Sequence, residues 1–346
     1  MEKVRFGVIG CGVIAPWHIN GILGSKGAEL IAVSDNVAEK AKKTGEEYKV
    51  DWYDDYKKMI ERKDIDAVTI GVPSGLHMQI ALEAMQAGKH VLTEKPIEVT
   101  LEKIDKMIET SKKTGKKLAC VFQGRYFENA KKIKETIEQG KFGKVVLGDM
   151  YNKWYRSPEY YKSSGWRATL ELDGGGALMN QAIHGIDLLL YYMGDVASVS
   201  AYAATLTRDI KVEDTAVAVL RFKSGALGVI EGTTSIYPGF SRKIEILGEK
   251  GSVVLEDNNT IVKWQFEGEE DLTSKFEDST KSVKATASAS ATAMTYIGHT
   301  MQIQDFTNAI LQGKQPEVNP VDARKSVEII LAIYKSSKER KEIKLG

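Results

Sequence analysis

Short apolar runs alternate with longer amphipathic stretches over the first third of the chain. The apolar runs have the length and composition of strands buried in a parallel sheet. They lie at residues 4–9, 30–34, 66–72, 90–93 and 117–122. The stretches between them have features of helices, which we expect at 14–23, 36–47, 54–62, 75–87 and 100–114. This alternation predicts an α/β domain with a doubly wound parallel sheet that ends near residue 122.

The pattern changes in the rest of the chain. A strand is expected at 143–153 and helices at 129–139 and 176–193. Strand-like runs then follow one another without helices, at 199–206, 215–222, 226–233, 243–247, 252–256 and 261–265. Consecutive strands predict a largely antiparallel sheet in an α+β domain.

The last part of the chain combines a low-complexity segment with two helices. Residues 281–294, rich in Ala, Ser and Thr, are expected to form a surface loop or a segment ordered by a partner subunit. Helices expected at 301–311 and 321–340 are predicted to pack back against the first domain.

A glycine-rich turn follows the first strand. In Gly10-x-Gly12-x-x-Ala15, the first glycine permits a tight bend, the second lets the backbone approach a pyrophosphate, and Ala15 packs helix on strand. The following helix offers N–H groups and a positive dipole end to phosphates. Asp35 ends the second strand, at the spacing of an acid that binds the adenosine ribose. The order of these features predicts a bound dinucleotide, the alternative being a fold that has lost its cofactor.

Asp35 also favours NAD over NADP. Its carboxylate would repel a 2′-phosphate, and the adjacent Asn36 supplies no cation to offset that repulsion.

Lys95 lies in Glu94-Lys95-Pro96, just past the carboxyl end of the strand at 90–93. In open α/β sheets, ligands bind in the crevice outside those ends. Lys95 is therefore placed where it can contact both cofactor and substrate. The alternative is a surface lysine in a charged loop.

The helix expected at 176–193 is apolar nearly all round, which predicts burial. Its polar residues Asn180, His184, Asp187 and Tyr191 nevertheless share one stripe in an α-helix. The stripe is either a hydrogen-bonded polar seam in the core or the wall of a cleft. In the second case His184 is an acid/base residue that Asp187 or Asn180 orients.

Aromatic and cationic residues are interleaved before that helix. They are Trp154-Tyr155-Arg156, Tyr160-Tyr161-Lys162 and Trp166-Arg167. Such a segment suits a sugar ring or a phosphate carried on one, although it is equally compatible with an irregular loop that packs on its own rings. Three arginines, Arg125, Arg156 and Arg167, are compatible with binding of a phosphorylated or nucleotide-linked sugar. The alternative is that they form structural ion pairs.

Composition narrows the class of protein. The 346 residues suffice for about two domains, and a net charge of +1 gives no reason to expect nucleic acid or a membrane surface as partner. Two cysteines without paired spacing, no signal peptide and no membrane-length apolar run predict a cytoplasmic protein. The histidines at 18, 77, 90 and 299 show no metal-ligand spacing, so no metal is predicted.

With these motifs in place, the chain resembles the Gfo/Idh/MocA oxidoreductases over essentially its whole length. The resemblance rests on residues 10–15, Pro73-Ser74-Gly75-Leu76-His77, Glu94-Lys95-Pro96 and the stretch from Gly174 to Asp187. It implies a Rossmann domain at 1–122 and a C-terminal domain at 123–346 whose large open sheet builds homodimers or homotetramers. It also implies a nicotinamide cofactor and a sugar-like substrate in an interdomain cleft.

The resemblance further implies roles for individual residues. Lys95 contacts substrate and cofactor, and His184 is the acid/base residue. The cofactor contacts are Gly10, Gly12, Val13, Ile14, Asp35, Pro73, His77, Glu94 and Lys95. The substrate contacts are Lys95, Arg125, Trp166, Arg167, Asn180 and His184. Two positions differ from the family pattern: Asn180 stands where Asp is common, and Val72-Pro73-Ser74 replaces Thr-Pro-Asn.

Together these features predict an NAD-dependent dehydrogenase that oxidises a secondary hydroxyl of a sugar, cyclitol or sugar derivative. Two other classes remain open. One is a glycosidase that reduces NAD transiently and returns the hydride. The other is a dinucleotide-binding regulator without catalysis, against which the presence of both Lys95 and His184 argues.

Overall fold

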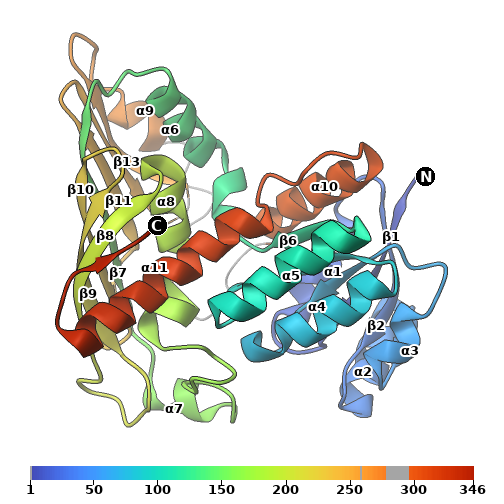
Figure 1. Ribbon diagram of the computed structural model, residues 1–346. Coiled ribbons are helices and arrows are strands. Elements are labelled where there is room, and N and C mark those ends of the chain that lie inside the picture. The colour runs from blue at the N-terminus through green and yellow to red at the C-terminus, as the bar shows by residue number, and fades with distance from the viewer. Residues whose placement is uncertain (1, 258, 278–295) are drawn as a thin grey trace. The chain divides into compact units, whose positions relative to one another are not determined.

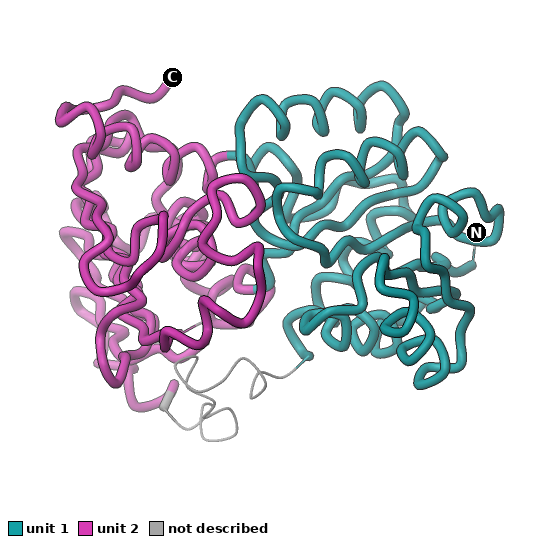
Figure 2. The backbone as a smooth tube through the Cα atoms, turned by 90° about the horizontal axis from the view of Figure 1, so that it is seen from below, with its two compact units in different colours: residues 1–123, 295–324 teal, residues 124–294, 325–346 magenta. Residues whose placement is uncertain are grey.

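The computed structural model describes residues 2–257, 259–277 and 296–346 (Figure 1). It divides into two compact units, which Figure 2 distinguishes by colour. Unit 1 comprises residues 1–123 and 295–324, and unit 2 comprises 124–294 and 325–346. The segment at 281–294, expected to be a loop, lies outside the described residues.

Unit 1 is built on a six-stranded sheet of order β3-β2-β1-β4-β5-β6. All neighbouring strands are parallel, so the predicted doubly wound parallel sheet is confirmed. The order reverses between β1 and β4, and a crevice outside the carboxyl ends at that point is where such sheets bind ligands. The strands are β1 (Val4–Ile9), β2 (Ala28–Ser34), β3 (Asp51–Tyr53), β4 (Ala67–Ile70), β5 (His90–Thr93) and β6 (Leu118–Cys120).

The helices of unit 1 follow these strands, and a later helix joins them. They are α1 (Ala15–Leu23), α2 (Ala38–Tyr48), α3 (Tyr56–Ile60), α4 (His77–Gln86), α5 (Leu101–Thr114) and α10 (Ile297–Leu311). Helix α10 packs on α1, and its Phe306 lies against Phe6 of β1 with ring centroids 6.4 Å apart. Both rings are fully buried, so residues 300 positions apart in the sequence share one core.

Two helices in unit 1 begin later than predicted. The helix expected from residue 36 begins at Ala38, and the Asp35 carboxylate before it accepts hydrogen bonds from the Cys11 and Val37 N–H groups. Asp55 caps α3 by accepting from the Lys57 N–H, which places it outside the helix. The three-residue strand β3 was missed, because so short a run carries no periodic signal.

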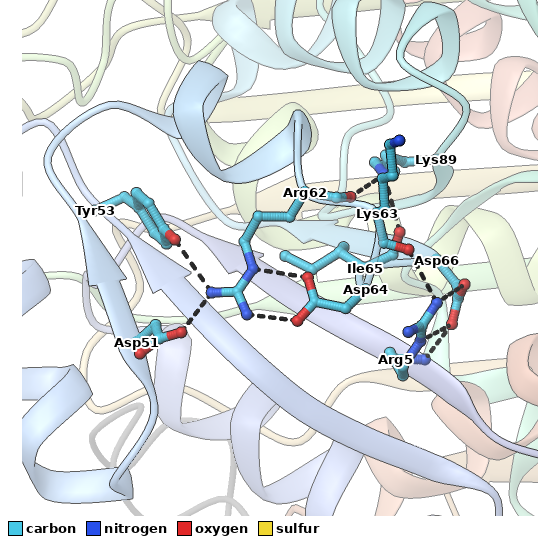
Figure 3. A network of polar contacts seen from close by, with 9 residues as sticks. All are labelled: Arg5, Asp51, Tyr53, Arg62, Lys63, Asp64, Ile65, Asp66 and Lys89. Carbon is cyan, nitrogen blue, oxygen red and sulfur yellow. Dashed lines mark hydrogen bonds and ion pairs between the residues drawn. The ribbon is translucent and has the colours of Figure 1, made fainter.

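A network of charges lies at the amino ends of the strands of unit 1 (Figure 3). Arg5 on β1 forms a bidentate pair with Asp66, which directly precedes β4. The buried Lys89 ammonium, just before β5, donates to the carbonyl oxygens of Arg62 and Ile65. This network stabilises the end of the sheet where the strands have their amino termini. The opposite end, at the carboxyl termini of the strands, is left available for ligands.

Unit 2 contains an eight-stranded sheet of order β13-β12-β11-β7-β10-β9-β8-β14. Only β7 and β10 pair in parallel, so the predicted, mostly antiparallel sheet is confirmed. The two-residue β14 was not predicted. The strands are β7 (Val145–Lys153), β8 (Val196–Ala204), β9 (Thr215–Phe222), β10 (Leu227–Thr233), β11 (Lys243–Gly248), β12 (Gly251–Glu256), β13 (Thr260–Phe266) and β14 (Ile343–Lys344).

The helices of unit 2 correct one prediction. The expected α-helix at 176–193 is instead a π-helix over Ala177–Ala182 that continues as α8 (Ile183–Met193). The α-helical periodicity from which the polar stripe was inferred therefore applies only from Ile183 onward. The other helices are α6 (Glu128–Glu138), α7 (Pro158–Lys162), α9 (Thr273–Glu277) and α11 (Pro320–Glu339), which begins in unit 1 and ends in unit 2. Within the described ranges, no helix is long and apolar enough to cross a membrane.

Candidate functional site

The glycine turn and Asp35 meet at the carboxyl ends of β1 and β2. The Cys11 N–H donates to one oxygen of Asp35, and the Val37 N–H donates to the other, both at 2.8 Å. These bonds fix the carboxylate beside the turn. Burial raises the pKa of the Cys11 thiol to about 11, which favours the protonated form of this cysteine.

The two glycines of the turn have different surroundings. Gly10 has φ +98°, and a Cβ there would lie 2.7 Å from the carbonyl oxygen of Gly71, so only glycine fits. A Cβ on Gly12 would meet nothing within 4 Å, so its backbone borders open space. An open backbone at a helix N-terminus, next to an anchored acid, fits a dinucleotide: Gly12, Val13 and Ile14 would face the pyrophosphate and Asp35 the ribose.

The loop that carries Lys95 is tied to the neighbouring loop by His77. The His77 ring is fully buried, and its two nitrogens lie 3.0 Å from the carbonyl oxygens of Val72 and Pro96. Burial lowers the pKa of His77. The ring therefore joins the segment after β4, which contains the half-buried Pro73, to the segment after β5, which contains the half-buried Lys95. A direct contact of His77 with the cofactor stays a prediction.

Glu94 forms a buried cluster with two histidines that sequence reasoning did not connect. His18 comes from α1 and His299 from α10, and the Nε2 atom of each lies 3.2 Å from Glu94 Oε1. The other carboxylate oxygen accepts from the Lys95 N–H. Burial opposes ionisation of Glu94, but the contacts with both imidazoles hold its pKa well below its usual range. We call these three residues the His–Glu–His cluster.

The His–Glu–His cluster bears on the prediction that no metal is bound. Its three potential ligand atoms lie within 4.8 Å of one another, an arrangement that could hold an ion. Sequence spacing could not show it, because Glu94 and His299 are 205 positions apart. The contact of His299 Nε2 with Glu94 is also a hydrogen bond, so the absence of a metal stays a prediction.

In unit 2, the glycine run before the π-helix is explained by close packing. A Cβ on Gly176 would lie 1.8 Å from the Glu213 carbonyl oxygen, and one on Gly175 would lie 2.2 Å from the Tyr334 hydroxyl oxygen. The Glu213 carboxylate accepts from the N–H groups of Gly176 and Leu178 at 2.9 Å and from the Tyr334 hydroxyl at 2.7 Å. Burial raises the pKa of Glu213 to about 7. Glu213 therefore anchors the start of the π-helix, a role that no sequence motif indicated.

Asn180 is held by its neighbours within unit 2. Its amide donates to Asp173 Oδ1 at 2.5 Å, and its carbonyl oxygen accepts from the Gln181 amide at 2.6 Å. His184 lies four residues further on, half-buried in the first turn of α8. A π-helix frequently marks a functional position in a helix, which is consistent with the predicted role of this segment.

Arg125 and Asp187 form a buried ion pair. Arg125 Nη2 lies 2.6 Å from Asp187 Oδ1, and Nε lies 2.9 Å from Oδ2. The two side chains are 5% and 1% exposed. This is the structural ion pair that the sequence left open as the alternative to a substrate contact of Arg125, and it anchors α8 near His184.

The predicted residues thus divide between the units. The proposed cofactor contacts all belong to unit 1, whereas Arg125, Trp166, Arg167, Asn180 and His184 belong to unit 2. Trp166 and Arg167 are half-buried.

Comparison with known proteins matches two stretches of the chain to family models. Residues 4–122 match the model of an oxidoreductase family with an NAD-binding Rossmann fold, and residues 130–254 match the Gfo/Idh/MocA C-terminal domain. The WlbA dehydrogenase from Bordetella pertussis, solved with NADH and UDP-GlcNAcA, is 35% identical, with a TM-score of 0.91 over 100% of this chain and 98% of that one. Its counterpart from Chromobacterium violaceum, with the same ligands, is 34% identical, with a TM-score of 0.89 over 100% and 97%.

A third relative is a myo-inositol 2-dehydrogenase from Thermotoga maritima, 28% identical over 99% of this chain and 98% of its own length. The prediction of an NAD-dependent oxidoreductase is therefore confirmed, and NAD is the cofactor. The chain belongs to the Gfo/Idh/MocA family of oxidoreductases.

Proposed function

We propose that this protein oxidises a secondary hydroxyl of a nucleotide-linked sugar acid, with UDP-GlcNAcA as the first substrate to test. The carrying observation is the 35% identity, over the whole chain, with a dehydrogenase solved with that compound and NADH. The runner-up is a cyclitol such as myo-inositol, supported by 28% identity with an inositol dehydrogenase.

The chemistry assigns His184 and Lys95 complementary roles. Bound NAD supplies the hydride acceptor. His184 takes the proton from the substrate hydroxyl, the task that a histidine most often performs in general acid–base catalysis. Lys95 donates a hydrogen bond to the same oxygen and stabilises the negative charge that develops on it.

Asn180 is held in place by hydrogen bonds with Gln181 and Asp173. As a neutral amide it can orient a substrate hydroxyl but cannot hold a charge. The proton therefore stays with His184. On the cofactor side, Pro73, His77 and Glu94 shape the loops that face the nicotinamide half, and Asp35 selects NAD over NADP.

The sheet of unit 2 supports association into homodimers or homotetramers. Tyr202 and Val217 are cross-strand partners that are 80% and 46% exposed, and Val219 and Leu227 nearby are 56% and 49% exposed. Contiguous exposed apolar side chains on a sheet face are typical of an interface. Both cysteines are free, which suits a cytoplasmic location.

The test is NADH absorbance in the presence of UDP-GlcNAcA, UDP-GlcNAc or myo-inositol, each with NAD and with NADP. We expect turnover with NAD and UDP-GlcNAcA, and near loss of turnover with retained NADH binding in His184→Ala. Turnover of myo-inositol alone would favour the runner-up, and unchanged turnover in His184→Ala would refute the assigned role. Glycoside cleavage without NADH accumulation would indicate a redox-assisted glycosidase instead.

A further inference from the structure

We propose that Arg156, Arg167 and Tyr160, together with Gln181, form a subsite of unit 2 that binds a carboxylate on the substrate's sugar ring. We call these four residues the arginine cluster. The proposal rests on the proposed function, because it names the chemical group by which a sugar acid is recognised.

The geometry of the arginine cluster brings two guanidinium groups to one tyrosine. The Arg167 guanidinium lies 4.3 Å from the centroid of the Tyr160 ring, and that of Arg156 lies 5.5 Å from it. Arg167 Nη1 donates to the Tyr160 hydroxyl at 2.6 Å, and the Gln181 amide donates to the same oxygen at 2.8 Å. Arg156 donates to Gln181 Oε1 through Nε and Nη2.

The cations have no anionic partner within the part of the chain that the structure describes. The hydrogen-bond acceptors of Arg156 are Gln181 Oε1 and the Tyr155 carbonyl oxygen, and that of Arg167 is the Tyr160 hydroxyl, all of them neutral. Neither arginine forms an ion pair with a described carboxylate. Arg167 Nε is buried without a hydrogen-bond partner, although a guanidinium has five N–H donors to satisfy.

This arrangement is costly without an anion. Burial lowers the pKa of Arg156, and the neighbouring Arg167 charge lowers it further. Asp173 is the nearby acid, but its oxygens already accept from the Asn180 amide and the Ala168 N–H. A bound carboxylate would offset the repulsion between the two guanidinium groups and accept hydrogen bonds from their remaining N–H groups. The planar carboxylate matches the planar guanidinium in geometry.

The position of the arginine cluster favours a group on the sugar ring over a distant diphosphate. Gln181 directly follows Asn180, and His184 lies three residues beyond Gln181. Four helical residues span only about 6 Å, so an anion bound at Gln181 lies within a ring's reach of the hydroxyl that His184 deprotonates. The ring carboxylate of a uronic acid satisfies this limit.

The test compares dissociation constants, in the presence of NADH, for UDP-GlcNAcA, UDP-GlcNAc and UDP. The first two share the diphosphate and differ in the carboxylate. We expect the wild-type protein to bind UDP-GlcNAcA more tightly than UDP-GlcNAc. In Arg167→Gln we expect affinity for UDP-GlcNAcA to fall about 10- to 100-fold, as for a lost charged hydrogen bond, and the preference to disappear. Arg167→Lys should restore part of it.

The control is Lys162→Gln, which removes a positive charge from an exposed position of the same segment and should leave the preference intact. Unchanged NADH binding and circular dichroism establish that each variant is folded. An equal loss of affinity for all three ligands would assign the cluster to the diphosphate and overturn the proposal. No loss in Arg167→Gln would also overturn it.

Glucuronate alone separates failure of this proposal from failure of the proposed function. Wild-type protein that binds glucuronate, loses it in Arg167→Gln and ignores every UDP compound would retain the carboxylate subsite and refute the nucleotide-sugar substrate. Protein that binds UDP-GlcNAcA and UDP-GlcNAc equally would retain the nucleotide-sugar assignment and refute the subsite.

Discussion

Asp187→Leu is expected to destabilise α8 strongly, because it leaves the Arg125 guanidinium buried without the carboxylate that pairs with it. Both partners are at most 5% exposed and are joined by two hydrogen bonds. Removing one member of a buried pair costs about 3–5 kcal/mol, since the remaining charge loses its compensation without regaining water. Arg125→Met is expected to cost a similar amount.

The double variant Arg125→Met/Asp187→Leu is expected to recover most of that loss. Replacing a buried pair by apolar residues of similar size is often neutral or stabilising, so the cycle should give a coupling energy of about 3 kcal/mol or more. Hydrogen exchange over residues 183–193 reports the opening free energy of α8, and urea midpoints report that of the whole unit. Glu138→Leu removes the exposed partner of a pair with the half-buried Lys134 and should change stability by less than about 1 kcal/mol.

Wild-type hydrogen-exchange protection of α8 in both single variants would refute this account of how α8 is held. A double variant no more stable than either single variant would also refute it. NADH binding serves as the internal reference, because the cofactor contacts are proposed to lie in unit 1.

Three further outcomes are expected. Gly176→Ala should destabilise the π-helix by about 1–3 kcal/mol, because the added Cβ meets the Glu213 carbonyl oxygen. Gly165→Ala, whose Cβ would have nothing within 4 Å, should leave stability nearly unchanged. Thermal unfolding checks both variants. Burial lowers the pKa of His90 to about 4, below the unfolded value of about 6.5, so its contribution to stability is present above pH 6.5 and is lost as pH falls toward 4. After discounting for partial exposure this contribution is about 1–2 kcal/mol, and His90→Gln should reduce the difference between urea midpoints at pH 7 and pH 4.5. The purified protein should contain no stoichiometric metal by elemental analysis, and chelation should leave turnover unchanged.

The parts of the fold set by local pattern were predictable, and those set by tertiary packing were not. Buried strands, the glycine turn and the position of Asp35 depend on residues close together in sequence, so their order identified the parallel sheet. The π-helix was not predictable from periodicity, because Gly175 and Gly176 are drawn against Tyr334 and Glu213, residues far away in the sequence. Glu213 carries no motif, since a carboxylate that accepts backbone N–H groups has no fixed spacing to its partners.

The same limit applies to the candidate site, where Glu94 was predicted as a cofactor contact on the strength of its neighbours in sequence. Its carboxylate contacts α1, α10 and the backbone of Lys95 through the His–Glu–His cluster, which no sequence spacing indicated, while a direct contact with the cofactor stays a prediction. Helix α1 begins directly after the glycine turn, so the helix whose N-terminus is proposed to face the pyrophosphate contacts, through His18, the same buried carboxylate that accepts from the Lys95 N–H. The glycine turn and the lysine, which look like separate motifs in the sequence, are therefore linked through one buried cluster of side chains within unit 1.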